Sequence, residues 1–398
     1  MAEKIVLAYS GGLDTSVAIK WLKEKYGYDV IAFGVDVGNE PDFPMLREKA
    51  EKLGAIKAYV EDAREVFVKD YVFPALQANV MYEGQYPLAT ALGRPLIAKL
   101  LVDIARREGA TAVGHGCTGK GNDQVRFDVS VAALAPDLKI VAPAREWDMT
   151  REETIRYADE HGIPIPITSA SPYSIDQNLW GRSIECGVME DPWNEPPDDA
   201  FIWARPMAET PDTPEYLEVE FEQGIPVALN GQKLGGIALL EKANEITGRH
   251  GIGRIDHIED RITGIKSREI YEAPAAMALI AAHRALEAMT LSKDQLRFNR
   301  IVSDEFAELI YTGLWFTGLR ENLRAYIKSN QPFVTGTVRL KLFKGFCHVV
   351  GRKSPKSLYR LDLATYDEGD IFDQRNSEGF IHIWGLPAKI QTQAQGGK

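Results

Sequence analysis

The sequence predicts an α/β fold: a doubly wound parallel sheet, followed by a second α+β domain and a C-terminal tail. Through the first 165 residues, short unbroken apolar runs alternate with segments of helical periodicity, as in parallel sheets covered on both faces. Later strands are longer and alternate apolar with polar residues, which is typical of antiparallel sheets. We therefore expect a first domain at 1–165, a second at 166–365 and an arm at 366–398.

The expected elements of the first domain follow each other in regular order. Strands are expected at 4–9, 29–37, 55–62, 110–116 and 139–144. Helices are expected at 15–25, 44–54, 64–80, 94–110, 124–134 and 150–162, although the alternation in 124–134 also fits a strand. Gly54, Gly109 and Gly162 stand where helices should stop, and Thr150 with Glu153 has the spacing of a capping box.

The pattern changes at the Pro- and Ser-rich stretch IPIPITSASPY, residues 163–173. Strands are then expected within 215–231 and 335–353, and helices at 236–248 and 274–291. The last of these helices has little polar surface, so we expect it to be buried in the core or against another subunit. The polar end of the chain is expected to be exposed or bound to a partner.

Composition excludes several classes of function. The formal net charge of −11 repels nucleic acid and anionic membranes, and no apolar run approaches the length of a membrane span. The three cysteines form no CxxC pair and the seven histidines are scattered, so we expect neither a disulfide framework nor a resident metal site. The start, MAEKIVLAYSGG, lacks a signal-peptide layout, and we expect a cytoplasmic protein.

The stretch AYSGGLDTS at residues 8–16 lies where the first strand passes into the first helix. Ligands of open α/β sheets bind beyond the carboxyl ends of the strands, and a helix N-terminus there attracts anions. Gly11 and Gly12 let the backbone turn tightly and approach a ligand, while Ser10, Thr15 and Ser16 add hydroxyl donors. The stretch predicts a pyrophosphate cradle, the alternative being a plain junction in which Ser or Asp caps the helix. It lacks the GK[ST] of a Walker A loop.

A second unusual segment is GHGCTGKGNDQVR at residues 114–126. Gly121 follows Lys120 where a P-loop requires Ser or Thr, which excludes that motif. On a helix, Asn122 and Arg126 would share one face and could hold an amino-acid zwitterion, because the Arg fork binds both carboxylate oxygens. The alternatives are a Gly-rich loop beside a surface helix, with Asp123 as a helix cap.

The segment SGGLDTS resembles the PP-loop, SGGxDS/T, of the N-type ATP pyrophosphatases. Together with HGxTGKGNDQVRF, HGIPIPIT, HGIGRID and KSREIYE, in this order, it is similar to the argininosuccinate synthase family from residue 4 to about residue 385. The resemblance implies ligation of L-citrulline to L-aspartate, with ATP converted to AMP and pyrophosphate through a citrullyl-adenylate. It also implies Mg²⁺ and a homotetramer.

The resemblance also assigns residues to the site. The nucleotide would be bound by Ala8, Tyr9, Ser10, Gly11, Gly12, Leu13, Asp14, Thr15, Ser16, Val35 and Gly116. The amino-acid substrates would be bound by Tyr86, Thr90, Ala91, Thr118, Asn122, Asp123, Arg126, Ser174, Ser183, Glu259 and Tyr271. The catalytic candidates are Asp14, Lys120 beside the leaving pyrophosphate, and Asp123, which would orient or deprotonate the aspartate amine.

This chain departs from the family pattern at several positions. Ala91 stands where some members have Ser, and Cys117 where Ala is common. The segment LWGRSIECG lacks the His-Ile-Ser of many members, and Pro387 is expected to interrupt the C-terminal segment that forms an arm to a neighbouring subunit.

Three rival functions remain open at this point. A tRNA-thiolating enzyme would need a reactive cysteine and a basic surface, which the net charge disfavours. Synthases of NAD, GMP or asparagine would need ammonia or an amidase segment, which we do not find. A non-catalytic ATP-binding regulator would explain the loop but not the second pocket that Asn122, Asp123 and Arg126 imply.

Overall fold

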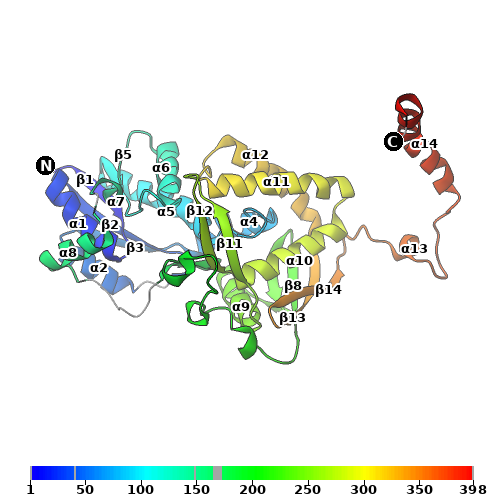
Figure 1. Ribbon diagram of the computed structural model, residues 1–398, viewed down its shortest axis with the longest axis horizontal. Helices are drawn as coiled ribbons and strands as arrows, with labels where there is room; N and C mark the ends of the chain where they lie inside the picture. Colours follow the sequence, from blue (N-terminus) through cyan, green and yellow to red (C-terminus); the bar gives the residue numbers. More distant parts are fainter. Residues whose placement is uncertain (1, 40–41, 148, 165–172, 397–398) are drawn as a thin grey trace. The chain divides into compact units, whose positions relative to one another are not determined.

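The computed structural model describes residues 2–39, 42–147, 149–164 and 173–396 (Figure 1). The expected domain boundary at 165 and the end of HGIPIPIT lie outside the described residues. The chain divides into two compact units, Met1–Lys356 and Ser357–Lys398.

The first unit contains the predicted parallel sheet, with strand order β3-β2-β1-β4-β5 and every neighbouring pair parallel. Its strands are β1 (Lys4–Ala8), β2 (Asp29–Asp36), β3 (Lys57–Asp62), β4 (Ala112–Gly114) and β5 (Lys139–Val141). Both faces are covered, because Ile5 and Leu7 of β1 pack in one apolar cluster and Val6 in another. The prediction of a doubly wound sheet is confirmed.

The predicted helices of this part are present, and a short helix at Pro143–Glu146 occupies the end of the strand expected at 139–144. The helices are α1 (Leu13–Tyr26), α2 (Phe43–Lys52), α3 (Arg64–Phe67), α4 (Phe73–Gln77), α5 (Ala89–Glu108), α6 (Asp123–Leu134), α7 (Pro143–Glu146) and α8 (Arg151–Glu160). A π-helical turn at Val68–Val72 joins α3 to α4 where one continuous helix was expected. The capping box of Thr150 and Glu153 is confirmed, and segment 124–134 is helical because α6 spans it.

Beyond residue 173 the chain forms two antiparallel sheets. One has the strand order β11-β12-β7-β6 and the other β10-β9-β8-β13-β14. The strands are β6 (Ser174–Asn178), β7 (Gly181–Glu185), β8 (Glu215–Glu222), β9 (Ile225–Leu229), β10 (Gln232–Lys233), β11 (Arg254–Asp260), β12 (Lys266–Glu272), β13 (Gly336–Phe343) and β14 (Phe346–Lys353). The expected strands at 215–231 and 335–353 are confirmed, whereas the sheet of β6, β7, β11 and β12 was not predicted.

Four longer helices accompany these sheets. They are α9 (Gly236–Arg249), α10 (Pro274–Thr290), α11 (Lys293–Tyr311) and α12 (Gly318–Asn330). The predicted burial of α10 is confirmed, because Ala275, Ala278 and Leu279 are fully buried in the core of this chain. Short 3₁₀ turns occupy Gly187–Glu190, Asp198–Ala200, Met207–Glu209 and Gln331–Phe333.

The second unit holds α13 (Leu361–Ala364) and α14 (Asn376–Gln395). The expected interruption at Pro387 is wrong, because α14 runs through that residue. Proline removes one backbone donor, but its φ is compatible with a helix. The apolar side chains of α14 are exposed, including those of Phe380, Ile383 and Trp384. In the described part of the chain, no helix is long and apolar enough to span a membrane.

A buried ion pair holds the strands β7 and β12 to the loop that precedes β8. Glu272 is fully buried, pairs with Arg182 and accepts the backbone N–H groups of Trp203 and Ala204, both at 2.8 Å. Removing one partner of a buried pair costs about 3–5 kcal/mol, because the remaining charge loses its compensation.

We therefore expect Glu272→Gln to lower the free energy of unfolding by about 3–5 kcal/mol, measured by urea denaturation. The control is Glu218→Gln, which removes the half-buried partner of the exposed Arg339 on another sheet, where the atoms lie 2.6 Å apart. That change should cost less than about 1 kcal/mol. Equal effects in the two variants would contradict the interpretation.

Candidate active site

Two adjoining cavities lie beyond the carboxyl ends of the parallel strands. The loop cavity is lined mainly by the β1–α1 loop, by β2 and by the segment after β4. The sheet cavity lies between the start of α6 and the strands β7, β11 and β12. They share five lining residues, Thr90, Cys117, Asp123, Ser183 and Glu185, which we call the junction.

The β1–α1 loop has the geometry of an anion cradle. Gly11 has φ +78°, and a Cβ there would lie 2.6 Å from Cδ1 of Leu46, so only glycine fits without strain. The Nζ of Lys49 donates to the Gly11 carbonyl at 2.6 Å. Helix α1 is capped by Gly12 with no side-chain hydrogen bond, which leaves its first-turn N–H groups available to a ligand. The alternative of a Ser or Asp cap is therefore wrong.

Most of the predicted nucleotide residues line the loop cavity. Those that do are Ala8, Tyr9, Ser10, Gly12, Leu13, Asp14, Thr15, Val35 and Gly116. Ser16 is buried, and its hydroxyl lies 3.4 Å from the Gly11 carbonyl, so it supports the loop from behind. Gly116 is packed so closely that a Cβ would come within 2.8 Å of Cγ2 of Thr15. Burial raises the pKa of the Asp14 carboxyl, and Arg151 opposes the shift.

The Asp123 carboxylate is held between two guanidinium groups. Its Oδ2 accepts from Nη2 of Arg94 at 2.7 Å, and its Oδ1 accepts from Nη1 of Arg126 at 2.8 Å. Burial by itself raises the pKa of Asp123, but the two guanidiniums outweigh it and lower the pKa to about 2. Asp123 does not cap α6, since no side-chain hydrogen bond closes that helix end. The same Nη2 of Arg94 also pairs with Asp176 of β6.

The predicted pair of Asn122 and Arg126 lies at the sheet cavity, and both residues are held by α11. The Nε of Arg126 donates to the Tyr311 carbonyl at 2.8 Å, and Nδ2 of Asn122 donates to the Tyr311 hydroxyl at 2.8 Å. The Nη2 of Arg126 is buried and has no hydrogen-bond partner among the described residues. A buried donor in this state is ready to bind an acidic group of a ligand.

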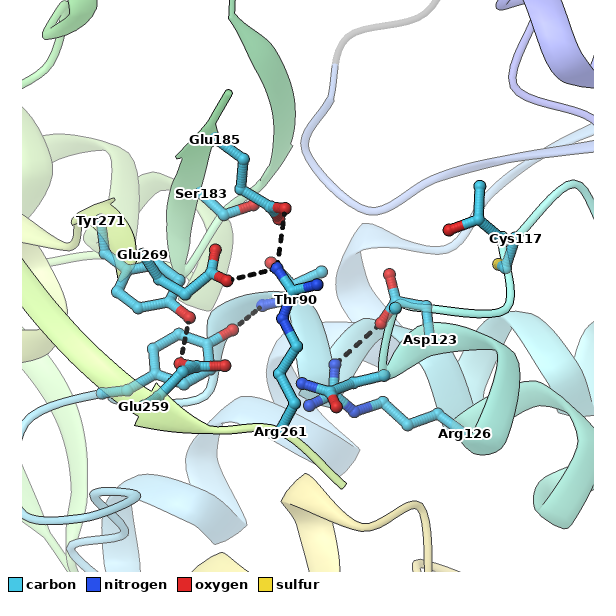
Figure 2. Close-up of a pocket in the computed structure, with 14 residues that line it drawn as sticks. Thr90, Cys117, Asp123, Arg126, Ser183, Glu185, Glu259, Arg261, Glu269 and Tyr271 are labelled. Atoms are coloured by element: carbon cyan, nitrogen blue, oxygen red, sulfur yellow. Dashed lines mark hydrogen bonds and ion pairs between the residues drawn. The ribbon is translucent and has the colours of Figure 1, made fainter. Parts of the chain in front are cut away.

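The opposite wall of the sheet cavity is a polar face of the four-stranded sheet (Figure 2). Ser183 pairs with Tyr271 across β7 and β12, which brings together two residues that the resemblance assigned to substrate. Glu259 of β11 is buried and accepts the hydroxyls of Tyr271 at 2.6 Å and Tyr311 at 2.7 Å. Burial raises the pKa of Glu259, which the two hydroxyls partly offset.

Two further carboxylates on this wall share one guanidinium. Nη2 of Arg261 donates to Oε1 of Glu269 at 2.6 Å and to Oε2 of Glu185 at 3.4 Å, as Figure 2 shows. The hydroxyl of Ser267 donates to the same Glu269 oxygen at 2.7 Å. Glu269 is therefore firmly held and Glu185 loosely held.

The other predicted residues fall in different places. Tyr86 and Thr118 line the sheet cavity, Thr90 lines both cavities, and Ser174 lines the loop cavity. Ala91 is fully buried within α5 and lines neither cavity. Lys120 is exposed on the loop before α6 and also lines neither cavity, so its catalytic role stays a prediction.

Sequence reasoning missed five residues that belong to this constellation. They are Arg94, Glu185, Arg261, Glu269 and Tyr311. Three of them stand two positions from a predicted residue: Glu185 from Ser183, Arg261 from Glu259 and Glu269 from Tyr271. Glu185 and Glu269 lie on β7 and β12, where side chains two apart share a face, so a strand assignment would have found these two. Arg261 directly follows the end of β11.

Comparison with known proteins identifies the family. Residues 4–164 match the model described as "Arginosuccinate synthase N-terminal HUP domain", and residues 173–391 match "Arginosuccinate synthase C-terminal domain". The chain belongs to the argininosuccinate synthase family. It is 66% identical to the argininosuccinate synthase of Dehalococcoides mccartyi, with 99% of this chain and 97% of that protein covered. It is also 57% identical to that of Symbiobacterium thermophilum, with 100% and 99% covered.

Family membership establishes the activity. The protein is an ATP-dependent ligase that joins citrulline to aspartate in arginine biosynthesis, as argininosuccinate synthases do. The family models match both parts of the chain and favour this ligase over the three rival functions, which were a tRNA-thiolating enzyme, an ammonia-using synthase and a non-catalytic ATP-binding regulator.

The cradle geometry predicts the effect of changing Gly11. We expect Gly11→Ala to weaken ATP binding at least about tenfold, measured by calorimetry, because the added Cβ strains a positive φ and meets Leu46. The control is Gly27→Ala at the end of α1, where φ is +70° and a Cβ would meet no atom within 4 Å. It should lower stability slightly and leave ATP affinity unchanged. Equal affinity in the two variants would show that the cradle does not bind ATP.

Proposed function

We propose that ATP occupies the loop cavity, that citrulline occupies the sheet cavity, and that their reacting atoms meet at the junction. The observation that carries this assignment is that the two cavities share five lining residues, so ligands in them can touch. Citrulline's ureido oxygen would attack the α-phosphate in line to form a citrullyl-adenylate, and the aspartate amine would then displace AMP. Such transfers depend mainly on positioning and charge stabilisation.

The phosphates would be bound by backbone N–H groups of residues 10–15 and by the hydroxyls of Ser10 and Thr15, which lie 3.2 Å apart. The described residues contain no group of three or more acidic, His or Cys side chains placed to hold a metal ion. Mg²⁺ typically binds through one or two carboxylates plus substrate phosphates, and Asp14 is suitably placed for this. Bound there, the ion would neutralise charge on the leaving pyrophosphate.

Each amino-acid substrate finds complementary groups. The unpartnered Nη2 of Arg126 suits the citrulline carboxylate, and the carboxylate of Glu259 suits its ammonium. Aspartate would be bound beside Thr118, Asn122 and Asp123. With both oxygens bound to guanidiniums and a pKa of about 2, Asp123 is a poor base and acts by orienting these groups.

We also propose how the chain is organised. Residues 1–165 would bind ATP, residues 166–365 would complete the substrate site, and residues 366–398 would form the arm of a homotetramer in the cytoplasm. The exposed apolar side chains of α14 support an arm that binds another subunit.

The products of the reaction test the proposal. Incubation with Mg²⁺-ATP and aspartate should release AMP and pyrophosphate only when citrulline is added, measured by nucleotide chromatography and a pyrophosphate assay. Formation of ADP, or turnover indifferent to citrulline, would refute the proposed reaction.

The orienting role of Asp123 predicts a difference between the two half-reactions. Asp123→Asn should leave citrulline-dependent exchange of pyrophosphate into ATP within about tenfold, while argininosuccinate formation falls at least about 100-fold with a raised KM for aspartate. The control is Asp128→Asn on the same helix, which pairs with Arg145 and lines neither cavity. Equal loss of both half-reactions in Asp123→Asn would contradict this role.

A further inference from the structure

The second half-reaction needs a proton acceptor, because aspartate carries an ammonium group and only the free amine is a nucleophile. The acceptor must reach the junction, where the adenylated carbon lies in the proposed function. Thr90 and Ser183 are neutral alcohols. Burial raises the pKa of the Cys117 thiol to about 12, so it stays protonated, and Asp123 is held by two guanidiniums.

Glu185 is the remaining residue of the junction, and its geometry suits proton transfer. It ends β7, two residues after Ser183, and is half-buried between the two cavities. Its contact with Nη2 of Arg261 is 3.4 Å, whereas Glu269 contacts the same atom at 2.6 Å. Because Glu269 forms the closer contact with the Arg261 guanidinium, the Glu185 carboxylate is only weakly bound there and can turn toward a ligand.

We propose that Glu185 is the general base of the second half-reaction, a role that rests on the proposed function. An N–H bond of the aspartate ammonium breaks and its proton moves to a carboxylate oxygen of Glu185. The freed electron pair forms the bond from nitrogen to the ureido carbon. The bond from that carbon to the phosphate oxygen then breaks, and AMP leaves with the electron pair.

The charges around Glu185 suit this task. Burial raises the pKa of Glu185 to about 7, and the carboxylate of Glu269 adds to the shift, as do those of Asp123 and Glu259, whereas Arg261 opposes it. A carboxylate of this pKa is about half ionised at pH 7 and strong enough to take the proton, which is close to the optimum for general base catalysis at neutral pH. Below pH 7 protonation removes the base, so the rate of ligation should rise with pH through about 7.

The test compares the half-reactions in the full-length enzyme carrying Glu185→Gln. Citrulline-dependent exchange of pyrophosphate into ATP should stay within about fivefold of the unmodified protein. Ligation of aspartate should fall about 10²- to 10⁴-fold, and the rise in rate near pH 7 should disappear. Loss of exchange as severe as the loss of ligation, or ligation with its pH profile intact, would overturn the proposal.

A second variant keeps the carboxylate of Glu185 and changes only its surroundings. Glu269→Gln removes a neighbouring negative charge and frees the Arg261 guanidinium to pair with Glu185. The pKa of Glu185 should therefore fall, and the rise of the ligation rate with pH should move to lower pH. If the pH profile of ligation in Glu269→Gln matched that of the unmodified protein, the proposal would be overturned even if Glu185→Gln failed to fold. If the unmodified protein showed no citrulline-dependent exchange, the proposed function itself would fail instead.

Discussion

The ion pairs of Asp123 with Arg94 and Arg126 are the constraint on which the arrangement of the site depends. They join α5 to the start of α6, while Nε of Arg126 binds the backbone of α11 and Arg94 reaches Asp176 of β6. Through these two guanidiniums a single carboxylate links helices beside the parallel sheet to α11 and β6, which follow later in the chain. Asp123 is half-buried, whereas Arg126 is buried, so removing the Asp123 charge would leave a buried guanidinium with one partner fewer. Arg126 is thus held from two sides, by the Asp123 carboxylate and by the Tyr311 carbonyl.

The two sheets contribute different chemistry because their strands differ in burial. Strands of the parallel sheet are apolar on both faces, so only their ends and the following loops carry polar groups. The strands of the β11-β12-β7-β6 sheet place carboxylates and hydroxyls on a face that lines a cavity. An anion therefore suits the first surface, with its backbone N–H groups, and an amino acid suits the second, with its paired acids and hydroxyls.

The sequence predicted what local patterns encode. Unbroken apolar runs and helix stops predicted the parallel sheet, and the glycine pair predicted the tight turn at Gly11. The hairpins β6–β7 and β11–β12 were not predicted, because polar residues that line the cavity interrupt the alternation of apolar and polar residues in these strands. Arg94, one of the two partners of Asp123, was not predicted for another reason: it lies 29 residues away, and a contact at that separation leaves no periodic signal.

Three carboxylates within one site differ in proton affinity because their neighbours differ. Asp123 faces two guanidiniums, and its pKa falls to about 2. Glu259 accepts two hydroxyls that only partly offset burial, and its pKa rises. Glu185 shares one guanidinium with a more tightly bound acid, and its pKa rises to about 7. Environments that separate pKa values in this way allow like residues to take unlike roles. The permanently charged carboxylate can orient its neighbours, and the loosely held one can exchange a proton.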